Sequence, residues 1–565
     1  MSTGGQALVE QLRREHVEIV FGIPGVQLDW AVDALCDAAP GIRYIVPRHE
    51  QATSYMADGY ARSTGKEGVC MMVPGPGVLN ALAGLATAWA CSTRLLFIAG
   101  QISSSAIGKG YGVLHEIPDQ SGILKSLTKW HALASTVEEI PALVHEAFRQ
   151  LRSGHPRPVA LEVPPDLLQA SIKQVAYYDP APFAPMPVDV AGIVDAARIL
   201  AGAKFPVIYA GGGVGAGNAG MVLQALAEKL QAPVVMTEGA RGTVSLEHPL
   251  ALSTLGSRCV LPYADVVLAA GTRFLDGIAR PIHSSSGCKF IYLNIDKEAA
   301  GAPRPPGLLL HGDVSLGLEA LLSAIGPLSR SNNRVDDVAK VKAWENAQMA
   351  GIKPQADYVA VLRSHIAEDA TLVSELTQVG YFANIAYPVY RPRSLITPGF
   401  QGTLGYGFPT ALGVAAGSPG KRTVSIVGDG GFGWGLQELS TAAKYKLDVS
   451  VVVFADDCFA NVQRIQRRNF GREFAVDLHN PDFQLLAKAF GIKSYRTDSP
   501  DGLAASLEAA QRDGGPCLIE VRVGEMPSPW PLIHPFVPAP MKPPPNPLGD
   551  PQYDSTEVSS RRGLG

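Results

Sequence analysis

The sequence predicts an α/β protein with three consecutive open sheets of parallel strands and a proline-rich C-terminal tail. The first observation behind this prediction is that short apolar runs ending in glycine alternate along the chain with segments of helical period. Apolar runs without polar alternation are typical of strands buried on both faces of a parallel sheet, and the helices between them supply the crossovers. The clearest runs begin at Gly68, Leu95, Pro206, Asp265 and Thr423.

The second observation concerns length and linkers. A chain of 565 residues is too long for one hydrophobic core and predicts about three to four domains. The proline-rich stretch 177–187 indicates an extended linker, and the polar stretch 327–340 indicates a second connector. Residues 527–551 are again rich in proline, which excludes a helix or a central strand there. We therefore expect domains at 1–175, 186–328 and 340–525, with residues 526–565 forming a tail or a lid.

Composition excludes several classes of protein. A chain that is 46% hydrophobic and 18% charged is an ordinary globular protein, and a net charge of −4 gives no basic footprint for nucleic acid. The seven cysteines form no CxxC pair, which favours buried reduced thiols over disulfides or a metal site. The sequence also carries no signal-peptide pattern and no apolar run long enough to span a bilayer. We expect a cytoplasmic protein without nucleic-acid or membrane partners.

A glycine-rich turn follows the strand predicted at 423–427. It reads Gly428-Asp429-Gly430-Gly431-Phe432, and a helical segment follows it. Such a turn presents free backbone N–H groups and the positive end of the helix dipole, which suits a diphosphate group. Asp429 adds an oxygen ligand for a divalent cation. Glycine turns also close many α/β units for purely structural reasons, so the turn alone leaves both interpretations open.

A second carboxylate supports the functional interpretation. The strand predicted at 449–454 ends just before Asp456, which lies 456 − 429 = 27 residues beyond Asp429. This spacing suits one helix and the adjacent strand, so both carboxylates should emerge at the carboxyl edge of one parallel sheet, where ligands bind. Two carboxylates and a backbone carbonyl make a Mg²⁺ or Ca²⁺ site when phosphate oxygens and water complete it.

This pair of elements resembles the thiamine-diphosphate (ThDP) motif of the acetolactate synthase and pyruvate decarboxylase superfamily. The resemblance implies bound ThDP and Mg²⁺, with Asp429, Asp456 and the carbonyl of Cys458 as metal ligands. Asp456 replaces the asparagine usual in the family and is still an oxygen donor. The resemblance covers nearly the whole chain, because further segments match in the family's order; they are 21–25, 48–52, 56–62, 75–80, 98–101 and 399–409. It implies pyrimidine-binding, central and diphosphate-binding domains.

The resemblance also implies roles for individual residues. Glu50 matches the catalytic glutamate that bonds the pyrimidine ring, although a helix-capping carboxylate would also explain it. Leu404 matches the apolar residue that holds the cofactor bent. The other residues implied to contact ThDP are Pro24, Gly25, Gly77, Asn80, Gln378, Gly402, Gly428, Gly430, Gly431, Phe432, Phe459 and Ala460. The family places the glutamate domain of one subunit against the diphosphate domain of another, so we expect at least a homodimer and favour a homotetramer.

The substrate side is where the chain departs from the family. His115 stands where the synthases carry glutamine, and it would either relay protons or simply fill a polar pocket. Gln378 matches a position on the aminopyrimidine side, and we expect it and His115 to be catalytic. We expect Val26, Gln27 and Ile465 to contact the substrate. Ile465 replaces the tryptophan that shapes the acceptor site of acetolactate synthases, which argues against that particular reaction.

These features predict a ThDP- and Mg²⁺-dependent enzyme that makes or breaks a C–C bond beside the carbonyl of a 2-keto acid, by decarboxylation or carboligation. A 2-hydroxyacyl-CoA lyase is the alternative within the same chemistry. The glycine run 211–217 only approximates a dinucleotide fingerprint, so FAD or a nucleotide in the central domain is a less favoured expectation. A flavin-dependent oxidoreductase, the alternative of another class, leaves Glu50, Asp429 and Asp456 unexplained.

Overall fold

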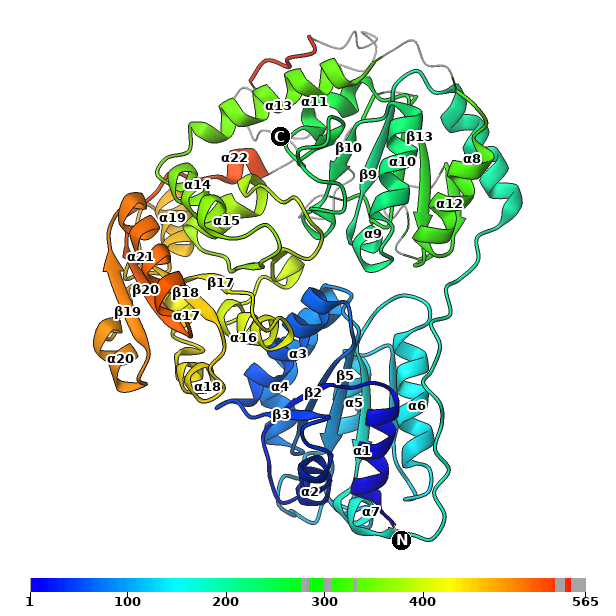
Figure 1. The fold of residues 1–565 in the computed structure, drawn as a ribbon, viewed down its shortest axis with the longest axis vertical. Coiled ribbons are helices and arrows are strands. Elements are labelled where there is room, and N and C mark those ends of the chain that lie inside the picture. Colours follow the sequence, from blue (N-terminus) through cyan, green and yellow to red (C-terminus); the bar gives the residue numbers. More distant parts are fainter. Residues whose placement is uncertain are drawn as a thin grey trace. The chain divides into compact units, whose positions relative to one another are not determined.

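The computed structural model describes residues 2–275, 282, 284–285, 287–298, 300, 307–328, 333–533 and 544–549. Its three six-stranded parallel sheets confirm the predicted α/β class (Figure 1). The chain forms two compact units: the first holds residues 1–184, 360–380 and 393–525, and the second holds 185–359, 381–392 and 526–565. Within the described residues, no helix is long and apolar enough to cross a membrane.

The first sheet, in the blue to cyan part of Figure 1, has the strand order β3-β2-β4-β5-β7-β6. Helices α3 and α4 pack on one face of this sheet, and α1, α2 and α6 pack on the other. Strands β1 and β8, which lie at the beginning and at the end of this part of the chain, form a short antiparallel pair. The elements are β1 (Ser2–Thr3), α1 (Gly4–Arg14), β2 (Ile19–Gly22), α2 (Asp29–Ala38), β3 (Arg43–Ile45), α3 (Glu50–Thr64), β4 (Gly68–Met72), α4 (Pro76–Ala90), β5 (Leu95–Gly100), α5 (Gln120–Ser126), β6 (Trp130–Leu133), α6 (Ile140–Leu151), β7 (Val159–Val163), α7 (Pro165–Gln169) and β8 (Ser171–Ile172).

The second sheet lies in the second unit and has the order β11-β10-β9-β12-β13-β14. The glycine run 211–217 sits in its first strand-to-helix turn. Gly211 and Gly213 pack directly against the backbone of Gly271, where a Cβ at either would clash, so close packing requires glycine there. The elements are α8 (Val190–Gly202), β9 (Pro206–Ala210), α9 (Gly212–Ala216), α10 (Gly220–Leu230), β10 (Val234–Met236), β11 (Ala251–Leu252), α11 (Ser257–Val260), β12 (Val266–Ala270), β13 (Lys289–Asn294), β14 (Leu308–His311), α12 (Val314–Ala324) and α13 (Val335–Ala350).

The third sheet has the order β16-β15-β17-β18-β20-β19 and belongs to the first unit. Short 3₁₀ helices occur in both units: at Glu238–Ala240 and Leu261–Tyr263 in the second, and at Gly399–Gln401 and Leu436–Glu438 in the first. The remaining elements of the chain, of which α22 and parts of α14 and α15 belong to the second unit, are α14 (Gln355–His365), β15 (Leu372–Ser374), α15 (Gln378–Ala386), β16 (Leu395–Ile396), α16 (Gly407–Gly417), β17 (Thr423–Gly428), α17 (Asp429–Phe432), α18 (Leu439–Lys444), β18 (Val449–Ala455), α19 (Ala460–Phe470), α20 (Phe483–Ala489), β19 (Lys493–Thr497), α21 (Pro500–Asp513), β20 (Cys517–Arg522) and α22 (Trp530–Ile533).

A close helix crossing unites the first and third sheets in the first unit. Helix α3 packs on α16, and one hydrophobic core runs continuously through both. Gly59 of α3 faces the carbonyl of Thr410, and Gly413 of α16 faces the carbonyl of Met56, so that a Cβ at either glycine would clash with backbone. The crossing therefore depends on these two glycines.

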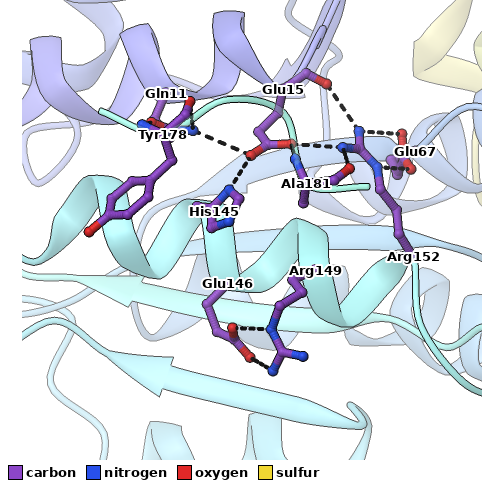
Figure 2. A network of polar contacts seen from close by, with 9 residues as sticks. All are labelled: Gln11, Glu15, Glu67, His145, Glu146, Arg149, Arg152, Tyr178 and Ala181. Carbon is purple, nitrogen blue, oxygen red and sulfur yellow. Dashed lines mark hydrogen bonds and ion pairs between the residues drawn. The ribbon is translucent and has the colours of Figure 1, made fainter. Parts of the chain in front are cut away.

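The linker that follows the first sheet is held by a buried polar network (Figure 2). The carboxylate of Glu15 accepts hydrogen bonds from Arg152 Nη1 at 2.8 Å and from the Ala181 N–H at 3.0 Å, and it lies 2.9 Å from His145 Nδ1. Arg152 also donates to the Ala181 carbonyl and pairs with Glu67. The stretch 177–184 is thus fixed to the first unit by specific bonds, although it contains no regular helix or strand.

The structure changes two sequence predictions, one about the second connector and one about the C-terminal tail. The second connector is shorter than predicted, because α13 already begins at Val335. Asp336 and Asp337 lie in the first turn of this helix, where carboxylates interact favourably with the helix dipole. In the predicted tail, the expectation that proline excludes a helix is wrong at α22 (Trp530–Ile533), where Pro531 lies in the first turn and is tolerated. Residues 544–549 are also described, whereas 534–543 and 550–565 lie outside the described residues. The boundaries of the three domains remain a prediction.

Candidate functional site

The predicted diphosphate turn lies where β17 passes into α17. Asp429 is buried, and its carboxylate accepts hydrogen bonds from the N–H of Gly430 at 2.9 Å, the N–H of Asp457 at 2.7 Å and Asn480 Nδ2 at 2.7 Å. A Cβ at Gly431 would clash with the Glu375 carboxylate. The turn is thus tightly packed on its inner side, and glycine there has a structural reason as well as the predicted functional one.

The second predicted carboxylate follows directly on β18. Asp456 Oδ2 accepts a 2.8 Å hydrogen bond from Gln378 Nε2, and Gln378 Oε1 accepts a 3.0 Å bond from Arg464 Nη2. Burial, and then the nearby charge of Asp429, raises the pKa of Asp456 to about 6. Burial also raises the pKa of Asp429. Burial is the largest cause of both shifts, and a cation would stabilise carboxylates in such a partly desolvated place.

The oxygen donors near Asp429 and Asp456 suit a divalent cation that also takes ligands from outside the protein. In the described part of the chain, no group of three or more His, Cys, Asp and Glu side chains is arranged to hold a metal. The predicted site has only two carboxylates and takes its third protein ligand from a carbonyl. Burial raises the pKa of the Cys458 thiol to about 12, so this residue would offer its carbonyl rather than a thiolate. Two carboxylates and a carbonyl fit a Mg²⁺ ion that also takes phosphate and water oxygens.

The predicted pyrimidine-side residues lie at the carboxyl edge of the first sheet. Glu50 is the first residue of α3, and its Oε2 accepts a 3.1 Å hydrogen bond from Asn80 Nδ2 on α4. Gly25, after β2, and Gly77, at the start of α4, both pack against the side chain of Val73. The structure thus brings Glu50, Asn80, Gly25 and Gly77 to neighbouring loops of one edge.

Two predicted substrate residues meet at the same edge. Gln27 is 7% exposed, and its Nε2 donates a 3.4 Å hydrogen bond to the carbonyl of Leu114, the residue before His115. Among the described residues, Gln27 Oε1 and His115 Nδ1 are buried without a hydrogen-bond partner. Buried polar atoms normally find partners, so this unsatisfied pair indicates a place for a ligand. Val26 is 66% exposed beside them.

Glu375 was missed by the sequence reasoning. It follows β15 and is buried, and its carboxylate accepts the N–H groups of Gly405 at 3.2 Å and Gly407 at 2.7 Å. It thereby fixes the turn that carries Leu404, which is half-buried, and it packs against Gly431 on its other side. Burial raises its pKa to about 7. A lone carboxylate directly after an apolar strand was the signal that could have revealed it.

Comparisons with family models and with known proteins indicate the same family over most of the chain. Residues 2–123, 193–321 and 376–521 match the N-terminal TPP binding domain, the central domain and the C-terminal TPP binding domain of thiamine pyrophosphate enzymes. A probable 2-ketoarginine decarboxylase of Pseudomonas aeruginosa is 36% identical over 92% of this chain and 94% of the relative. The chain belongs to the thiamine pyrophosphate enzyme family. The acetolactate synthase isozyme 1 large subunit of Escherichia coli is 31% identical over 94% of this chain and 96% of its own. A probable acetolactate synthase large subunit of Methanocaldococcus jannaschii is also 31% identical, over 96% and 93%.

Two other predicted residues of this thiamine pyrophosphate enzyme, Phe432 and Ile465, have the surroundings of ordinary core and surface side chains. Phe432 is buried, with its ring 5.8 Å from that of Phe408 and 5.7 Å from that of Phe483, so its side chain belongs to the core. Ile465 is 40% exposed on α19, a helix without buried residues. On the same helix, Arg464 rather than Ile465 bonds the predicted residue Gln378.

The predicted residues of this enzyme fall into two groups. One surrounds Glu50 on the first sheet, and the other surrounds Asp429 and Asp456 on the third. Glu438, which the sequence reasoning missed, connects their surroundings, because its carboxylate accepts the N–H groups of Arg48 at 3.0 Å and His49 at 3.1 Å. Its partners lie about 390 residues earlier in the chain, so no local signal points to them.

Proposed function

We propose that this thiamine pyrophosphate enzyme is a ThDP- and Mg²⁺-dependent decarboxylase of a 2-keto acid, with carboligation of the same class of substrate as the second activity. The observation that carries the proposal is the pair formed by the buried Asp429 and the half-buried Asp456, at the ends of the neighbouring strands β17 and β18 and beside a glycine turn. When bound, ThDP supplies a carbon nucleophile and an electron sink for the loss of CO₂ or for a new C–C bond.

The diphosphate group of residues would hold the cofactor's charged end. Asp429, Asp456 and the Cys458 carbonyl would bind Mg²⁺, and the turn at Gly428 and Gly430 would offer backbone N–H groups to the diphosphate. Gln378 would act through Asp456, because its amide fixes one carboxylate oxygen. Residues that hold metal ligands in this way tune metal affinity although they do not touch the metal.

The pyrimidine group of residues would handle the protons. Glu50 would share a proton with a ring nitrogen of the aminopyrimidine, and the bond from Asn80 keeps its carboxylate in place. His115 would take up or deliver a proton at the reacting carbon, since an imidazole has both a donor and an acceptor nitrogen. Leu404, held by Glu375 through Gly405, would support the bent cofactor.

The unsatisfied atoms favour a polar substrate. Gln27 Oε1 is a hydrogen-bond acceptor, and His115 Nδ1 is an acceptor in one of its tautomers. A 2-keto acid whose side chain carries N–H or O–H groups would satisfy them, and 2-ketoarginine, named in the P. aeruginosa relative, is one such acid. The absence of the acceptor-site tryptophan at Ile465 supports decarboxylation over acetolactate synthesis. No observation favours the 2-hydroxyacyl-CoA lyase.

A homodimer at minimum, and a homotetramer as the favoured assembly, belong to this proposal. Large apolar side chains are exposed in both groups of site segments: Tyr111 and Leu114 beside His115, and Trp434 beside the diphosphate turn are each more than half exposed. Exposed apolar side chains of this size are commonly covered by a partner. We also propose a cytoplasmic location, which the seven free cysteines support.

The experiment that tests the function is a substrate panel with ThDP and Mg²⁺. Pyruvate, 2-ketobutyrate and 2-ketoarginine are assayed for CO₂ release and for carboligation products, and a 2-hydroxyacyl-CoA is assayed for cleavage. We expect cofactor-dependent CO₂ release that is fastest with the polar substrate. Cleavage of the thioester alone would favour the lyase, and a flavin absorbance in a protein without ThDP-dependent activity would support the oxidoreductase.

A further inference from the structure

A buried carboxylate lies beneath the edge where the predicted pyrimidine-side residues meet. Glu162 is the fourth residue of β7, whose other four residues are apolar, and its side chain is fully buried. None of the site predictions includes it. A carboxylate placed inside a sheet without water is costly unless several donors satisfy it, so its surroundings need an explanation.

Four side chains from three neighbouring segments donate to Glu162. They are His131 Nε2 at 2.6 Å, Ser121 Oγ at 2.5 Å, Gln120 Nε2 at 2.7 Å and Gln101 Nε2 at 3.1 Å. Burial alone would raise the pKa of Glu162, but the bonds from His131, Ser121 and Gln120 outweigh it and hold the pKa below its ordinary value. Glu162 is therefore a charged carboxylate that fixes the start of α5 against β5 and β6.

Gln120 links Glu162 to the loops of the site through hydrogen bonds. Its Nε2 is fixed by Glu162 and by the Gly100 carbonyl at 3.0 Å, which turns its Oε1 to the N–H of Gly75 at 2.9 Å. Gly75 has a φ of +58°, and a Cβ there would clash with the carbonyl of His115. The backbone of Gly75 thus lies between the Gln120 amide and the backbone of His115.

Gly75 also begins the helix that leads to the predicted pyrimidine-side residues. Gly75 is the N-cap of α4 and has no side chain to cap the helix itself. The Gln120 amide therefore sets the position of the first turn of α4, which contains Gly77 and leads to Asn80, the partner of Glu50. Bonds of 2.7 Å from Gln120 to Glu162 and 2.9 Å from Gly75 to Gln120 thus connect the interior of the sheet to Gly75, whose backbone lies against the His115 carbonyl and caps the helix that carries Asn80.

We propose that Glu162 and Gln120 are positioning residues, which set the His115 loop and the N-terminus of α4 for the chemistry at the pyrimidine side. The role rests on the proposed function, because it presumes that this edge acts on ThDP and substrate. Glu162→Gln replaces a carboxylate that accepts four bonds with an amide whose –NH₂ faces donors. The Gln120 amide then loses its fixed orientation, and Gly75 loses its partner.

A matched control lies near the amino end of the same sheet. Glu15 is also a buried carboxylate, 1% exposed, that is paired with a histidine, His145, and with further donors (Figure 2). Its partners hold the linker 177–184 and include no residue of the predicted site. Glu15→Gln therefore removes a comparable buried charge without touching the loops of the site.

The test combines amide hydrogen–deuterium exchange of the full chain without cofactor, ThDP affinity, and kinetics. In Glu162→Gln we expect faster exchange at 75–80 and 102–119, and kcat lower by about tenfold to a hundredfold with a smaller change in substrate KM. In Glu15→Gln we expect faster exchange at 177–184 and unchanged kcat. Gln120→Ala, which leaves the Glu162–His131 pair in place, should repeat the effect of Glu162→Gln and serves if that variant does not fold.

Different outcomes would contradict the positioning role of Glu162 and Gln120 and the proposed function. Wild-type exchange at 75–80 and 102–119 in both Glu162→Gln and Gln120→Ala would overturn the positioning role. Equal losses of kcat in Glu162→Gln and Glu15→Gln would overturn it too, since they would report general destabilisation. A wild-type protein that fails to bind ThDP with Mg²⁺ would instead overturn the proposed function, while the exchange data would still decide whether Glu162 orders the loops.

Discussion

The side-chain amide of Gln378 donates a 2.8 Å hydrogen bond to the carboxylate of Asp456, joining the start of α15 to the end of β18. The other end of the same amide accepts from Arg464 on α19. One glutamine therefore orders three segments around the predicted metal site. This arrangement supports the proposal that Gln378 acts at the predicted metal site, whereas the sequence resemblance pointed to the aminopyrimidine side of the cofactor.

Replacing Gln378 with alanine is expected to weaken Mg²⁺ binding. Without the amide, the Asp456 carboxylate loses the donor that orients it, and lost orienting bonds around a metal site typically cost about tenfold to a hundredfold in affinity. Mg²⁺ titration in the presence of ThDP measures the change. Gln224→Ala is the control, because Gln224 bonds Glu228 on the surface of the second unit, away from the predicted site. Equal Mg²⁺ affinity of Gln378→Ala and wild type would contradict the assignment.

Replacing Glu375 with alanine is expected to reduce kcat by about tenfold or more while the protein stays folded. The substitution removes the acceptor of the Gly405 and Gly407 N–H groups and leaves a space beside Gly431, so both the Leu404 turn and the diphosphate turn lose support. Glu375→Gln, which keeps one acceptor oxygen, should lie between wild type and alanine. Steady-state kinetics with saturating ThDP measures the order, and a fully active alanine variant would show that the turn needs no such support.

Replacing Gly413 with alanine is expected to destabilise the first unit. The new methyl group would meet the Met56 carbonyl at the α3–α16 crossing, and overpacking of this kind costs about 1–3 kcal/mol. Gly202→Ala is the control, since a Cβ there meets nothing within 4 Å and alanine is the better helix former. Chemical denaturation compares the two. A Gly413→Ala variant as stable as wild type would mean that the helices can separate without loss.

Glu345 on α13 is expected to make the stability of the second unit depend on pH. Burial raises its pKa to about 7 from an ordinary 4.5, although Ser253 and Gly256 donate to it. Because the folded pKa is the higher one, the unfolded chain releases the proton first, and stability falls as the pH rises from about 4.5 to about 7 and is constant above.

Glu345→Gln removes this titration and keeps an oxygen for both donors. The stability of the variant relative to wild type should therefore increase between pH 5 and pH 7 and change little from pH 7 to pH 8, as followed by thermal unfolding. Glu247→Gln, an exposed neighbour in the same unit, should show no such trend. A flat difference for Glu345→Gln would contradict the raised pKa.

The sequence was informative where structure is local. The strands at Gly68, Leu95, Pro206 and Thr423 follow from apolar runs that end in glycine, and the turn at Asp429 follows from its own residues. Asp456 could be placed at the same edge because parallel strands end together. Glu162 and Glu438 could not be assigned, because each acts through partners that the fold brings from far along the chain. The place of Glu375 directly after an apolar strand was a usable signal, but its partners Gly405 and Gly407 become visible only in the fold. The unsatisfied atoms of Gln27 and His115 likewise become visible only when burial is known.

The measurement that tests the central claim most directly is the binding of ThDP by calorimetry, with and without Mg²⁺, in wild type, Asp429→Ala and Asp457→Asn. Asp457 is the matched neighbour, since its carboxylate bonds Asn480 and Arg522 and is not a predicted ligand. We predict Mg²⁺-dependent ThDP binding in wild type and Asp457→Asn, and its loss in Asp429→Ala. Equal ThDP binding by wild type and Asp429→Ala, or binding that is indifferent to Mg²⁺, would contradict the proposed site.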